Sequence, residues 1–391
     1  MQARLILGKR VLHMDFFKLR KYLDEMVEEF GVPGCDCTIY KEHEQVFRHK
    51  SGFSDFERTK SVSENDMYWL YSTSKITTCT AALQLVERGV ISLSDPVSKY
   101  LPEYADITVR DNGGVRPAKT VMTIEHLFTM SSGLDYQLDK VPTLQVLAKY
   151  GEEANTRQLV ESFAKSPLLF DPGCGYFYSL SHDVLAAVVE VASGIQFSKY
   201  VEENIFKPLG MRDSGYHMIP ERRARMAAEY RVSPDYSHLE YIGCVNPYIP
   251  TPAYESGGAG IISCVDEYVR VLDALANGGV GITGAQILKP ETIDNMRTAR
   301  IDPRVIHRFF GYETDLTGYS YGLGVRTRVS NEYSKVPIGE FGWDGAAGAY
   351  ALIDPENHIA VFYEQHILNH LPVTSRFHPA IRELVYEGFG F

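Results

Sequence analysis

The sequence has little basic charge compared with its acidic charge. Its 391 residues contain 39 Lys and Arg against 50 Asp and Glu, which gives a formal net charge of −11 at pH 7. A protein that binds nucleic acid needs a basic surface to neutralise phosphates, so we expect no nucleic-acid partner. The chain also has no apolar run near the roughly 20 residues that span a bilayer, and we expect no membrane partner.

An export signal is missing as well. A signal peptide needs an apolar stretch of roughly 7–15 residues followed by small residues at a cleavage site. The first ten residues contain only three consecutive apolar residues, Leu5 to Leu7, before charge returns at Lys9. We therefore expect a cytoplasmic protein.

Cysteine is sparse, with six residues in the whole chain. So few thiols fit a reduced compartment better than a disulfide scaffold. Cys35 and Cys37 lie on either side of Asp36 in the sequence, so in a strand both would point to the same face. The sequence has no second pair of ligands at the spacing that a metal site with them would need. Glu and His residues over 364–370 lack the H-E-x-x-H pattern, and nucleotide-binding glycine motifs are absent. We therefore expect no metal and no cofactor.

Apolar residues recur at helical spacing in two segments near the N-terminus. The first covers residues 16–30, and the second covers residues 72–88, with Gly89 placed as a C-terminal cap. Between them, the short segments 37–40 and 45–48 surround a charged turn and predict a β-hairpin.

The middle of the chain, from about residue 100 to 240, predicts mostly helices and loops. Residues 183–193 are apolar nearly all round, which indicates a buried helix, and Gly194 ends it. After about residue 250 the pattern returns to strands, two of them around the turn Asp354-Pro355-Glu356-Asn357. We expect an α/β layer built from both chain ends, with a helical insertion between them.

The segment Tyr71-Ser72-Thr73-Ser74-Lys75 carries the first chemical signal. Three residues apart on a helix, Ser72 and Lys75 share a face, so the amine can reach the hydroxyl. A serine becomes a nucleophile when a base takes its proton, and a lysine whose pKa is lowered by burial and nearby cations can be that base. Read alone, the pattern is better explained by a capping serine and a solvated lysine, because it arises by chance in many chains of this length.

A second signal lies in the turn before the buried helix. Gly173 and Gly175 allow a tight turn that presents Tyr178. A tyrosine beside a positively charged lysine titrates more easily, so Tyr178 could move protons between Ser72 and a leaving group. Read alone, Tyr178 is also explained as a core residue whose hydroxyl bonds to the backbone.

Small residues surround Trp343 in the segment Phe341-Gly-Trp-Asp-Gly-Ala-Ala-Gly348. They suit a strand whose backbone approaches a ligand closely. With a period of two, Trp343 and Gly345 share one face and Asp344 takes the other. A backbone N–H just after Gly345 could then form half of an oxyanion hole. Read alone, the segment is a glycine-rich strand with a packing tryptophan.

In this order along the chain, the three motifs resemble those of the serine β-lactamase-like and penicillin-binding protein superfamily. More narrowly, they resemble the class C β-lactamase-related hydrolases and the family VIII esterases. Matching blocks at residues 85–102, 123–133 and 256–263 extend the resemblance over nearly the whole chain. It implies an α+β fold with an antiparallel sheet flanked by helices and an inserted, mostly helical domain.

The resemblance also implies domain boundaries. Residues 1–100 and 240–391 would form the α/β domain, residues 101–239 would form the inserted domain, and the active site would lie at their interface.

Site residues follow from the same resemblance where the motifs match. Ser72 would be the acylated nucleophile, and Lys75 and Tyr178 would share the general-base and general-acid roles. The N–H groups of Ser72 and Ala346 would form the oxyanion hole. The remaining residues expected to contact the substrate are Trp343, Gly345 and Leu180.

Two of these positions depart from the pattern of the superfamily. Trp343 stands where β-lactamases and peptidases usually carry a Lys or His that helps to bind a substrate carboxylate. Leu180 stands where an Asn often bonds the amide side chain of the substrate. Both departures favour small or apolar esters over β-lactams, and Trp343 is typical of the esterase branch.

We therefore expect a serine hydrolase that cleaves small-molecule carboxylic esters through an acyl-enzyme on Ser72. The same acyl-serine chemistry leaves a β-lactamase, a D-amino-acid peptidase or an acyltransferase as alternatives. An alternative of another class is a non-catalytic binding protein on this scaffold, which the retention of Ser72, Lys75 and Tyr178 disfavours.

Overall fold

The computed structural model describes residues 14–302, 318–332, 334 and 336–391. The N-terminal segment, in which we expect no signal peptide, lies outside these residues. A seven-stranded sheet in the order β2-β1-β13-β12-β11-β10-β9 forms the centre of one half, and each neighbouring pair is antiparallel. Its strands are β1 (Gly34–Lys41), β2 (Glu44–Gly52), β9 (Tyr319–Tyr321), β10 (Arg326–Arg328), β11 (Phe341–Asp344), β12 (Tyr350–Asp354) and β13 (Ile359–Glu364).

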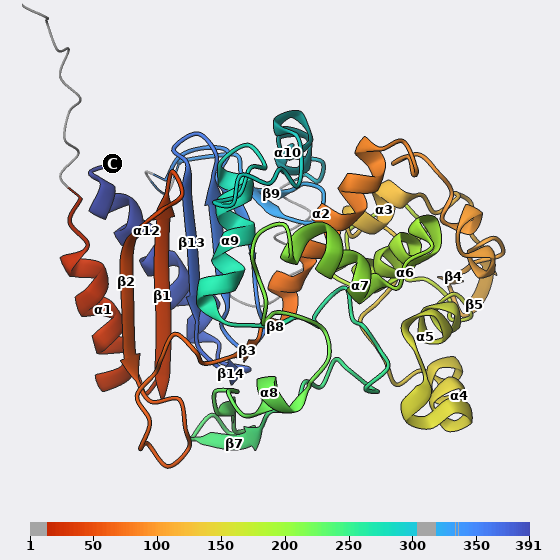
Figure 1. Cartoon of the computed structure of the whole chain (residues 1–391). Helices are drawn as coiled ribbons and strands as arrows, with labels where there is room; N and C mark the ends of the chain where they lie inside the picture. The colour runs from red at the N-terminus through yellow and green to blue at the C-terminus, as the bar shows by residue number, and fades with distance from the viewer. Residues whose placement is uncertain (1–13, 303–317, 333, 335) are drawn as a thin grey trace, which may run out of the picture.

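Helices cover both faces of this sheet. As Figure 1 shows, α1 (Phe17–Glu28) and α12 (His378–Phe389) lie side by side on one face, and α9 (Val265–Ala276) packs on the other. Because both faces are covered, every residue of β13 is buried. The expected layer built from the two chain ends, an antiparallel sheet flanked by helices, is confirmed.

The region after residue 250 contains helices as well as strands. Besides α9 and α12, it holds α10 (Pro290–Arg297). The buried residues of α9 recur at helical spacing and pack against the sheet, among them Val265, Val269 and Leu272. The expected return to strands did not include these helices, which carry the helical period rather than the alternating one.

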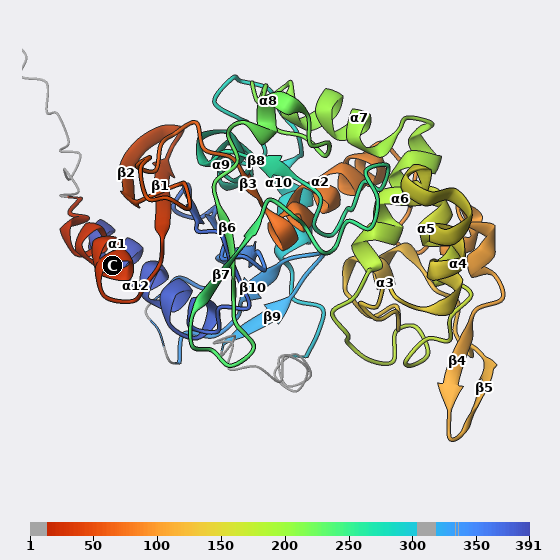
Figure 2. The ribbon, with the colours of Figure 1, turned by 90° about the horizontal axis from the view of Figure 1, so that it is seen from below.

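Most of the other helices gather beside the sheet, on the right in Figures 1 and 2. The buried one, α6 (Ser181–Ser193), ends at Gly194, whose φ of +69° favours glycine. The other elements of this half are α3 (Ile124–Phe128), α4 (Val141–Tyr150), α5 (Thr156–Phe163), α7 (Phe197–Val201) and a protruding hairpin of β4 (Thr108–Asp111) and β5 (Gly114–Pro117). The boundaries at residues 100 and 240 stay a prediction.

Short strands and a one-turn helix join the two halves. β6 (Glu229–Val232) pairs in parallel with β14 (Ile367–Leu368) and antiparallel with β7 (Leu239–Gly243). The helix α8 (Pro220–Arg223) precedes β6 in the chain. β3 (Tyr68–Trp69) pairs with β8 (Ile262–Ser263). β3 leads directly into the segment that carries Ser72.

The helix predicted over residues 72–88 differs in one respect from the expectation of a single apolar stripe. It begins as a 3-10 turn, η1 (Tyr71–Thr73), and continues as α2 (Ser74–Glu87), in which Ser74 to Leu85 are all buried. Its threonines are accommodated because the hydroxyls of Thr78 and Thr80 bond to backbone carbonyls and that of Thr77 bonds to the Tyr268 hydroxyl. Thr78, for example, donates to the Gly257 carbonyl at 2.7 Å. Burial of α2 from Ser74 to Leu85 places Lys75 in the interior.

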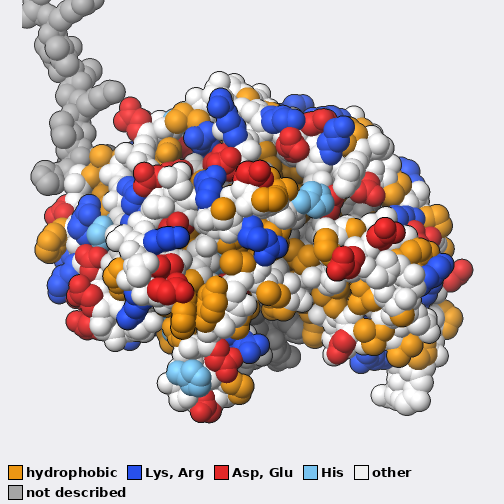
Figure 3. Space-filling model, turned by 60° about the horizontal axis from the view of Figure 1, so that its bottom comes forward, with side chains coloured by type: hydrophobic (Ala, Val, Ile, Leu, Met, Phe, Trp, Pro, Cys, Tyr) orange, Lys and Arg blue, Asp and Glu red, His pale blue; other side chains and the backbone are white. Residues whose placement is uncertain are grey.

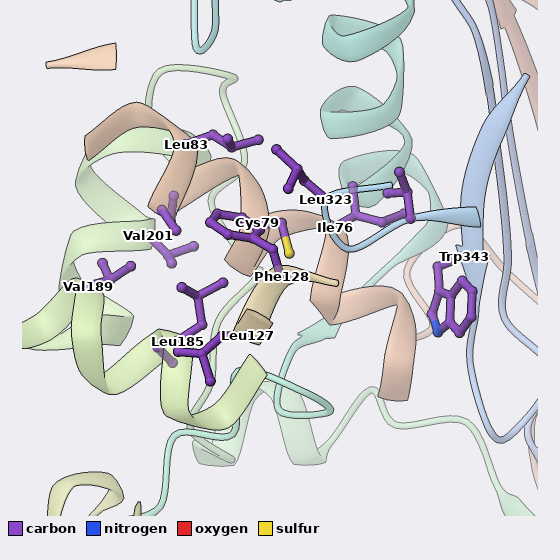
Figure 4. Close-up of a cluster of buried hydrophobic side chains, with 14 of the residues drawn as sticks. Ile76, Cys79, Leu83, Leu127, Phe128, Leu185, Val189, Val201, Leu323 and Trp343 are labelled. Atoms are coloured by element: carbon purple, nitrogen blue, oxygen red, sulfur yellow. The ribbon is translucent and has the colours of Figure 1, made fainter. Parts of the chain in front are cut away.

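The largest hydrophobic core surrounds α2 and includes residues of both the sheet and the helical half. In Figure 4, Ile76, Cys79 and Leu83 of α2 and Leu185 of α6 lie in one cluster, with Trp343 of β11 at the sheet end. This core fixes α2 between the two halves, since both halves pack against it.

The surface in Figure 3 carries interspersed acidic and basic side chains, and hydrophobic side chains gather in the hollow between the two halves. Within the described part of the chain, no single helix is long and apolar enough to cross a membrane. α6 and the segment Phe197–Phe206 reach that length and composition only together, as a pair bent by 78°.

Candidate active site

Ser72 lies in the η1 turn, between the sheet and the helical half, and its side chain is largely buried. The residue before it, Tyr71, has a φ of +48°, a conformation that a tyrosine rarely adopts. The Tyr71 hydroxyl donates a hydrogen bond to the buried carboxyl group of Glu229 on β6. This bond ties the backbone next to Ser72 to a strand from the middle of the chain.

Lys75 points at Ser72 from the next turn of the chain. Its Nζ lies 3.1 Å from the Ser72 Oγ and donates to the Gly258 carbonyl at 2.7 Å. The side chain is completely buried, and this burial lowers the pKa of Lys75 to about 7. A neutral amine is therefore present in a large fraction of the molecules at neutral pH, within contact of the serine hydroxyl.

Tyr178 meets the same two residues from the loop before α6. Its hydroxyl shares a hydrogen bond with Ser72 and accepts one from Trp343 Nε1 at 3.1 Å. Lys75 Nζ lies 4.7 Å from the centre of the Tyr178 ring. The side chains of Ser72, Lys75 and Tyr178 therefore converge, although Tyr178 is distant from the other two along the sequence.

The expectation that Tyr178 titrates more easily is wrong. Burial raises the pKa of its hydroxyl well above the usual value for tyrosine, and the hydrogen bonds from Ser72 and Trp343 offset this only in part. The Tyr178 hydroxyl is therefore protonated in the resting site, and Lys75 is the more readily neutralised base of the two.

Tyr136 is a site residue that the sequence analysis missed. Its hydroxyl accepts a hydrogen bond from Lys75 at 3.3 Å and shares another with Ser72. Its ring is stacked on that of Tyr178, with centroids 5.5 Å apart and planes inclined by 18°. Its only sequence signal was its position three residues after the block that ends at Gly133.

The turn after β11 lies against the backbone that precedes Ser72. A Cβ atom on Gly345 would come within 2.5 Å of the Leu70 carbonyl oxygen, so the strand end approaches that backbone closely. The Gly345 N–H donates to the Ala349 carbonyl at 2.8 Å, which closes a tight turn with exposed Ala346 near its tip. This arrangement keeps Ala346 in the neighbourhood of η1.

Alternation along β11 separates Trp343 from Asp344. Trp343 faces Tyr178, whereas the Asp344 carboxylate accepts a hydrogen bond from Arg326 at 2.7 Å and lies 3.6 Å from the His378 ring nitrogen. The predicted orientation of Asp344, away from the face that Trp343 shares with Gly345, is confirmed by these partners.

Leu180 lies at the start of α6, and only 4% of its surface is exposed. It lines a small interior space together with Leu134, Phe163 and Leu168, and its N–H donates to the Asp135 carbonyl at 3.0 Å. Its expected contact with substrate stays a prediction.

A further aromatic ring comes from the segment after α8. Tyr248 packs edge-on against Tyr136, with centroids 5.5 Å apart, and against Tyr71 at 5.9 Å. The walls around Ser72 are therefore largely aromatic. Among the residues that the structure describes, no group of three or more His, Cys, Asp or Glu side chains is arranged to hold a metal ion.

The chain matches known proteins over most of its length. The sequence model of the family described as Beta-lactamase matches residues 19–377. Esterase EstB of Burkholderia gladioli is 32% identical over 365 residues, covering 86% of this chain and 86% of EstB.

Solved structures share the fold. EstCE1, a hydrolase with promiscuous acyltransferase activity, has a TM-score of 0.77 at 24% identity, covering 95% of this chain and 98% of EstCE1. A family VIII carboxylesterase has a TM-score of 0.74 at 20% identity, covering 95% and 97% of the two chains.

These likenesses confirm the resemblance that the motifs indicated and the β-lactamase-like α+β fold. The relatives are named as hydrolases and esterases, in agreement with a serine hydrolase. The chain therefore belongs to the Beta-lactamase family of serine hydrolases.

Proposed function

We propose that this protein hydrolyses carboxylic esters through a covalent acyl-enzyme on Ser72. The observation that carries the proposal is the contact of the Ser72 hydroxyl with two groups able to handle its proton. These are the buried amine of Lys75 at 3.1 Å and the hydroxyl of Tyr178. A nucleophile, a base and a second proton carrier within hydrogen-bond reach are what acyl transfer to serine requires.

In the acylation step, neutral Lys75 takes the Ser72 proton as the Oγ attacks the ester carbonyl. The N–H groups of Ser72 and Ala346 stabilise the negative charge that develops on the carbonyl oxygen. The C–O bond to the alcohol then breaks, and the alcohol leaves with a proton from Lys75, relayed through the Tyr178 hydroxyl. Water attacks the acyl group in the second half of the reaction, and its proton returns Ser72 to the hydroxyl form.

The substrate preference follows from the aromatic walls. Trp343 replaces the cation that would bind a carboxylate, and its indole N–H is already engaged with Tyr178. We therefore propose neutral, small or apolar esters, with Trp343 and Gly345 as substrate contacts. The name of EstB supports an esterase.

Transfer of the acyl group to an alcohol in place of water is the second candidate. EstCE1 is described as a hydrolase with promiscuous acyltransferase activity, and the same acyl-Ser72 intermediate serves both reactions. β-Lactam or D-amino-acid peptide cleavage would use this intermediate too, but Trp343 and Leu180 disfavour those substrates.

Hydrolysis of aryl acetate and butyrate by the wild type and by Ser72→Ala tests the proposal. We expect Ser72→Ala to lose about 1,000-fold or more of kcat, because the nucleophile is removed. Ser162→Ala is the matched control, since Ser162 is a buried serine of α5 that bonds to Thr143 and Leu159 rather than to Lys75.

Three outcomes would overturn the proposal. Equal rates for the wild type and Ser72→Ala would exclude an acyl-enzyme on Ser72. The absence of a fluorophosphonate adduct on Ser72 would favour the non-catalytic binding protein. Faster turnover of a chromogenic cephalosporin than of short aryl esters would instead make the protein a β-lactamase.

A further inference from the structure

Asp183 is a buried carboxyl group that the proposed reaction does not use. It lies in the first turn of α6 with 1% of its surface exposed. Its Oδ1 accepts hydrogen bonds from Ser256 at 2.6 Å, Tyr254 at 2.8 Å and the Gly258 N–H at 3.4 Å. Its Oδ2 is buried and has no hydrogen-bond partner among the described residues. One oxygen is therefore anchored, and the other is left free in the interior.

The Asp183 Oδ2 and the Lys75 amine both lie close to the position that a side chain on Gly258 would occupy. A Cβ atom on Gly258 would come within 2.7 Å of the Asp183 Oδ2 and 3.2 Å of the Lys75 Nζ. The Gly258 carbonyl accepts a hydrogen bond from Lys75, and its N–H reaches Asp183. The absence of a side chain at residue 258 thus lets a carboxylate and an amine approach one another without forming a direct ion pair.

The other groups around Lys75 do not supply a negative charge at neutral pH. Burial raises the pKa of the tyrosine hydroxyls and of the Cys79 thiol, and it lowers the pKa of the His182 ring to about 3, so these groups are neutral. The neighbours of Lys75 with titratable or polar groups come from three parts of the chain. Ser72 of η1 and Cys79 of α2 lie on the same segment as Lys75. The helical half contributes Tyr136, Tyr178, His182 and Asp183, and the segment before β8 contributes Tyr254 and the Gly258 carbonyl.

Asp183 is therefore the carboxylate whose charge acts on Lys75. Its Coulomb interaction raises the pKa of Lys75, against the larger effect of burial, which lowers it. Burial raises the pKa of the Asp183 carboxyl group, and the hydrogen bond from Ser256 and the charge of Lys75 oppose this rise by favouring the ionised form. In a site with little solvent, such a charge acts over several ångströms.

We propose that Asp183 is a positioning residue that supplies the buried counter-charge of Lys75 and so sets the pH above which Lys75 can accept the Ser72 proton. The role rests on the proposed function and deepens it, since Asp183 acts through Lys75 and touches neither the serine nor the acyl group. Without Asp183, the ammonium form of Lys75 would lose its compensating charge, and the amine would be neutral at lower pH.

The pH profile of kcat/KM for aryl butyrate, measured from pH 5 to 9 on the full chain, tests this role. Asp183→Asn keeps the shape and an acceptor for Ser256 and Tyr254 while it removes the charge. We expect the acid limb of the profile to move to lower pH by about one unit or more. The plateau falls as well, because a less basic amine is a weaker general base.

Asp273→Asn is the matched control, because Asp273 of α9 is also 1% exposed but bonds to His43 and Asn277. Its acid limb should coincide with that of the wild type. The rate of fluorophosphonate labelling of Ser72, followed over the same pH range, should shift in Asp183→Asn by the same amount. A purely structural role for Asp183 would lower the rates without moving either limb.

If Asp183→Asn fails to fold, as judged by circular dichroism, Ser256→Ala replaces it. Loss of the 2.6 Å hydrogen bond makes Asp183 easier to protonate, so the limb should move in the same direction by a smaller amount. If a folded variant keeps its Ser72-dependent activity and the acid limb of its pH profile does not move, the role of Asp183 is overturned but the proposed function is not. Activity that persists in Ser72→Ala overturns the proposed function itself.

Discussion

In the proposed reaction, the protonation state of one side chain, Lys75, determines when the site can react. Its folded-state pKa of about 7 lies below the ordinary value of 10.5, chiefly because the amine is buried. The neutral form, which accepts the Ser72 proton in the proposed reaction, therefore accumulates as the pH rises through 7.

We expect kcat/KM for an aryl ester to fall about tenfold per pH unit below pH 7 and to level off above it. Lys75→Arg should abolish this activity at every pH up to 10, because a guanidinium stays protonated. The measurement is a steady-state rate profile in buffers of constant ionic strength. A profile of the wild type that is flat between pH 5 and 8 would contradict the role of Lys75.

The indole of Trp343 acts on Tyr178 through a single hydrogen bond, from Nε1 to the tyrosine hydroxyl at 3.1 Å. Trp343→Phe keeps an aromatic ring against Tyr178 but removes this donor. We expect kcat to fall about five- to tenfold, the value of one hydrogen bond of about 1 kcal/mol. Trp69→Phe is the control, because Trp69 Nε1 donates to the Cys244 carbonyl and not to Tyr178. Equal losses in the two variants would count against a specific role for the Trp343 N–H.

At the scale of elements, the site depends on how closely the end of β11 approaches η1. Gly345 permits this approach, since any side chain there would meet the Leu70 carbonyl oxygen. A backbone oxygen cannot move aside as the end of a flexible side chain can, so the turn itself must shift.

Gly345→Ala should therefore displace Ala346 and weaken the oxyanion hole. We expect kcat to fall about ten- to a hundredfold, with a loss of stability of about 1–3 kcal/mol. Gly114→Ala in the β4–β5 hairpin is the control, because a Cβ there meets no atom within 4 Å. Rates from ester hydrolysis and melting temperatures separate the two effects. Unchanged kcat in Gly345→Ala would remove the turn from the proposed mechanism.

At the scale of the whole molecule, stability depends on acids buried at the junction of the two halves. Burial raises the pKa of Glu229, which accepts the hydrogen bond of Tyr71, to about 8. Between pH 4.5 and 8 the folded state therefore holds a proton on Glu229 that the unfolded state has released. By linkage, this group makes the free energy of unfolding decrease as the pH rises through that range.

Glu229→Gln should remove this dependence, because the amide resembles the protonated carboxyl group. Near pH 5 the variant and the wild type should have similar stability. By pH 8 the variant should be more stable than the wild type by about 2 kcal/mol or more. Urea unfolding at pH 5 and pH 8 provides the comparison. A difference between the two proteins that is constant with pH would contradict a protonated Glu229.

Local patterns predicted much of this architecture. Gly194 ends α6 as expected, with a positive φ. The strands β12 and β13 lie on either side of the predicted turn at residues 354–357. The helix α9 was not predicted, and the burial of α2 from Ser74 to Leu85 was not anticipated from a sequence in which its threonines count as polar.

The sequence by itself determined the family, the order of the three motifs and the pairing of Ser72 with Lys75. Spacing along a helix, turn-forming glycines and apolar periods are local properties, so they can be recognised in the sequence without the fold. Only the tertiary structure decided that Tyr136 joins the site, that burial keeps Tyr178 protonated, and that Asp183 and Lys75 approach one another beside Gly258. The physical reason is that desolvation and Coulomb interactions depend on distances through space, which residues far apart in the chain acquire only on folding.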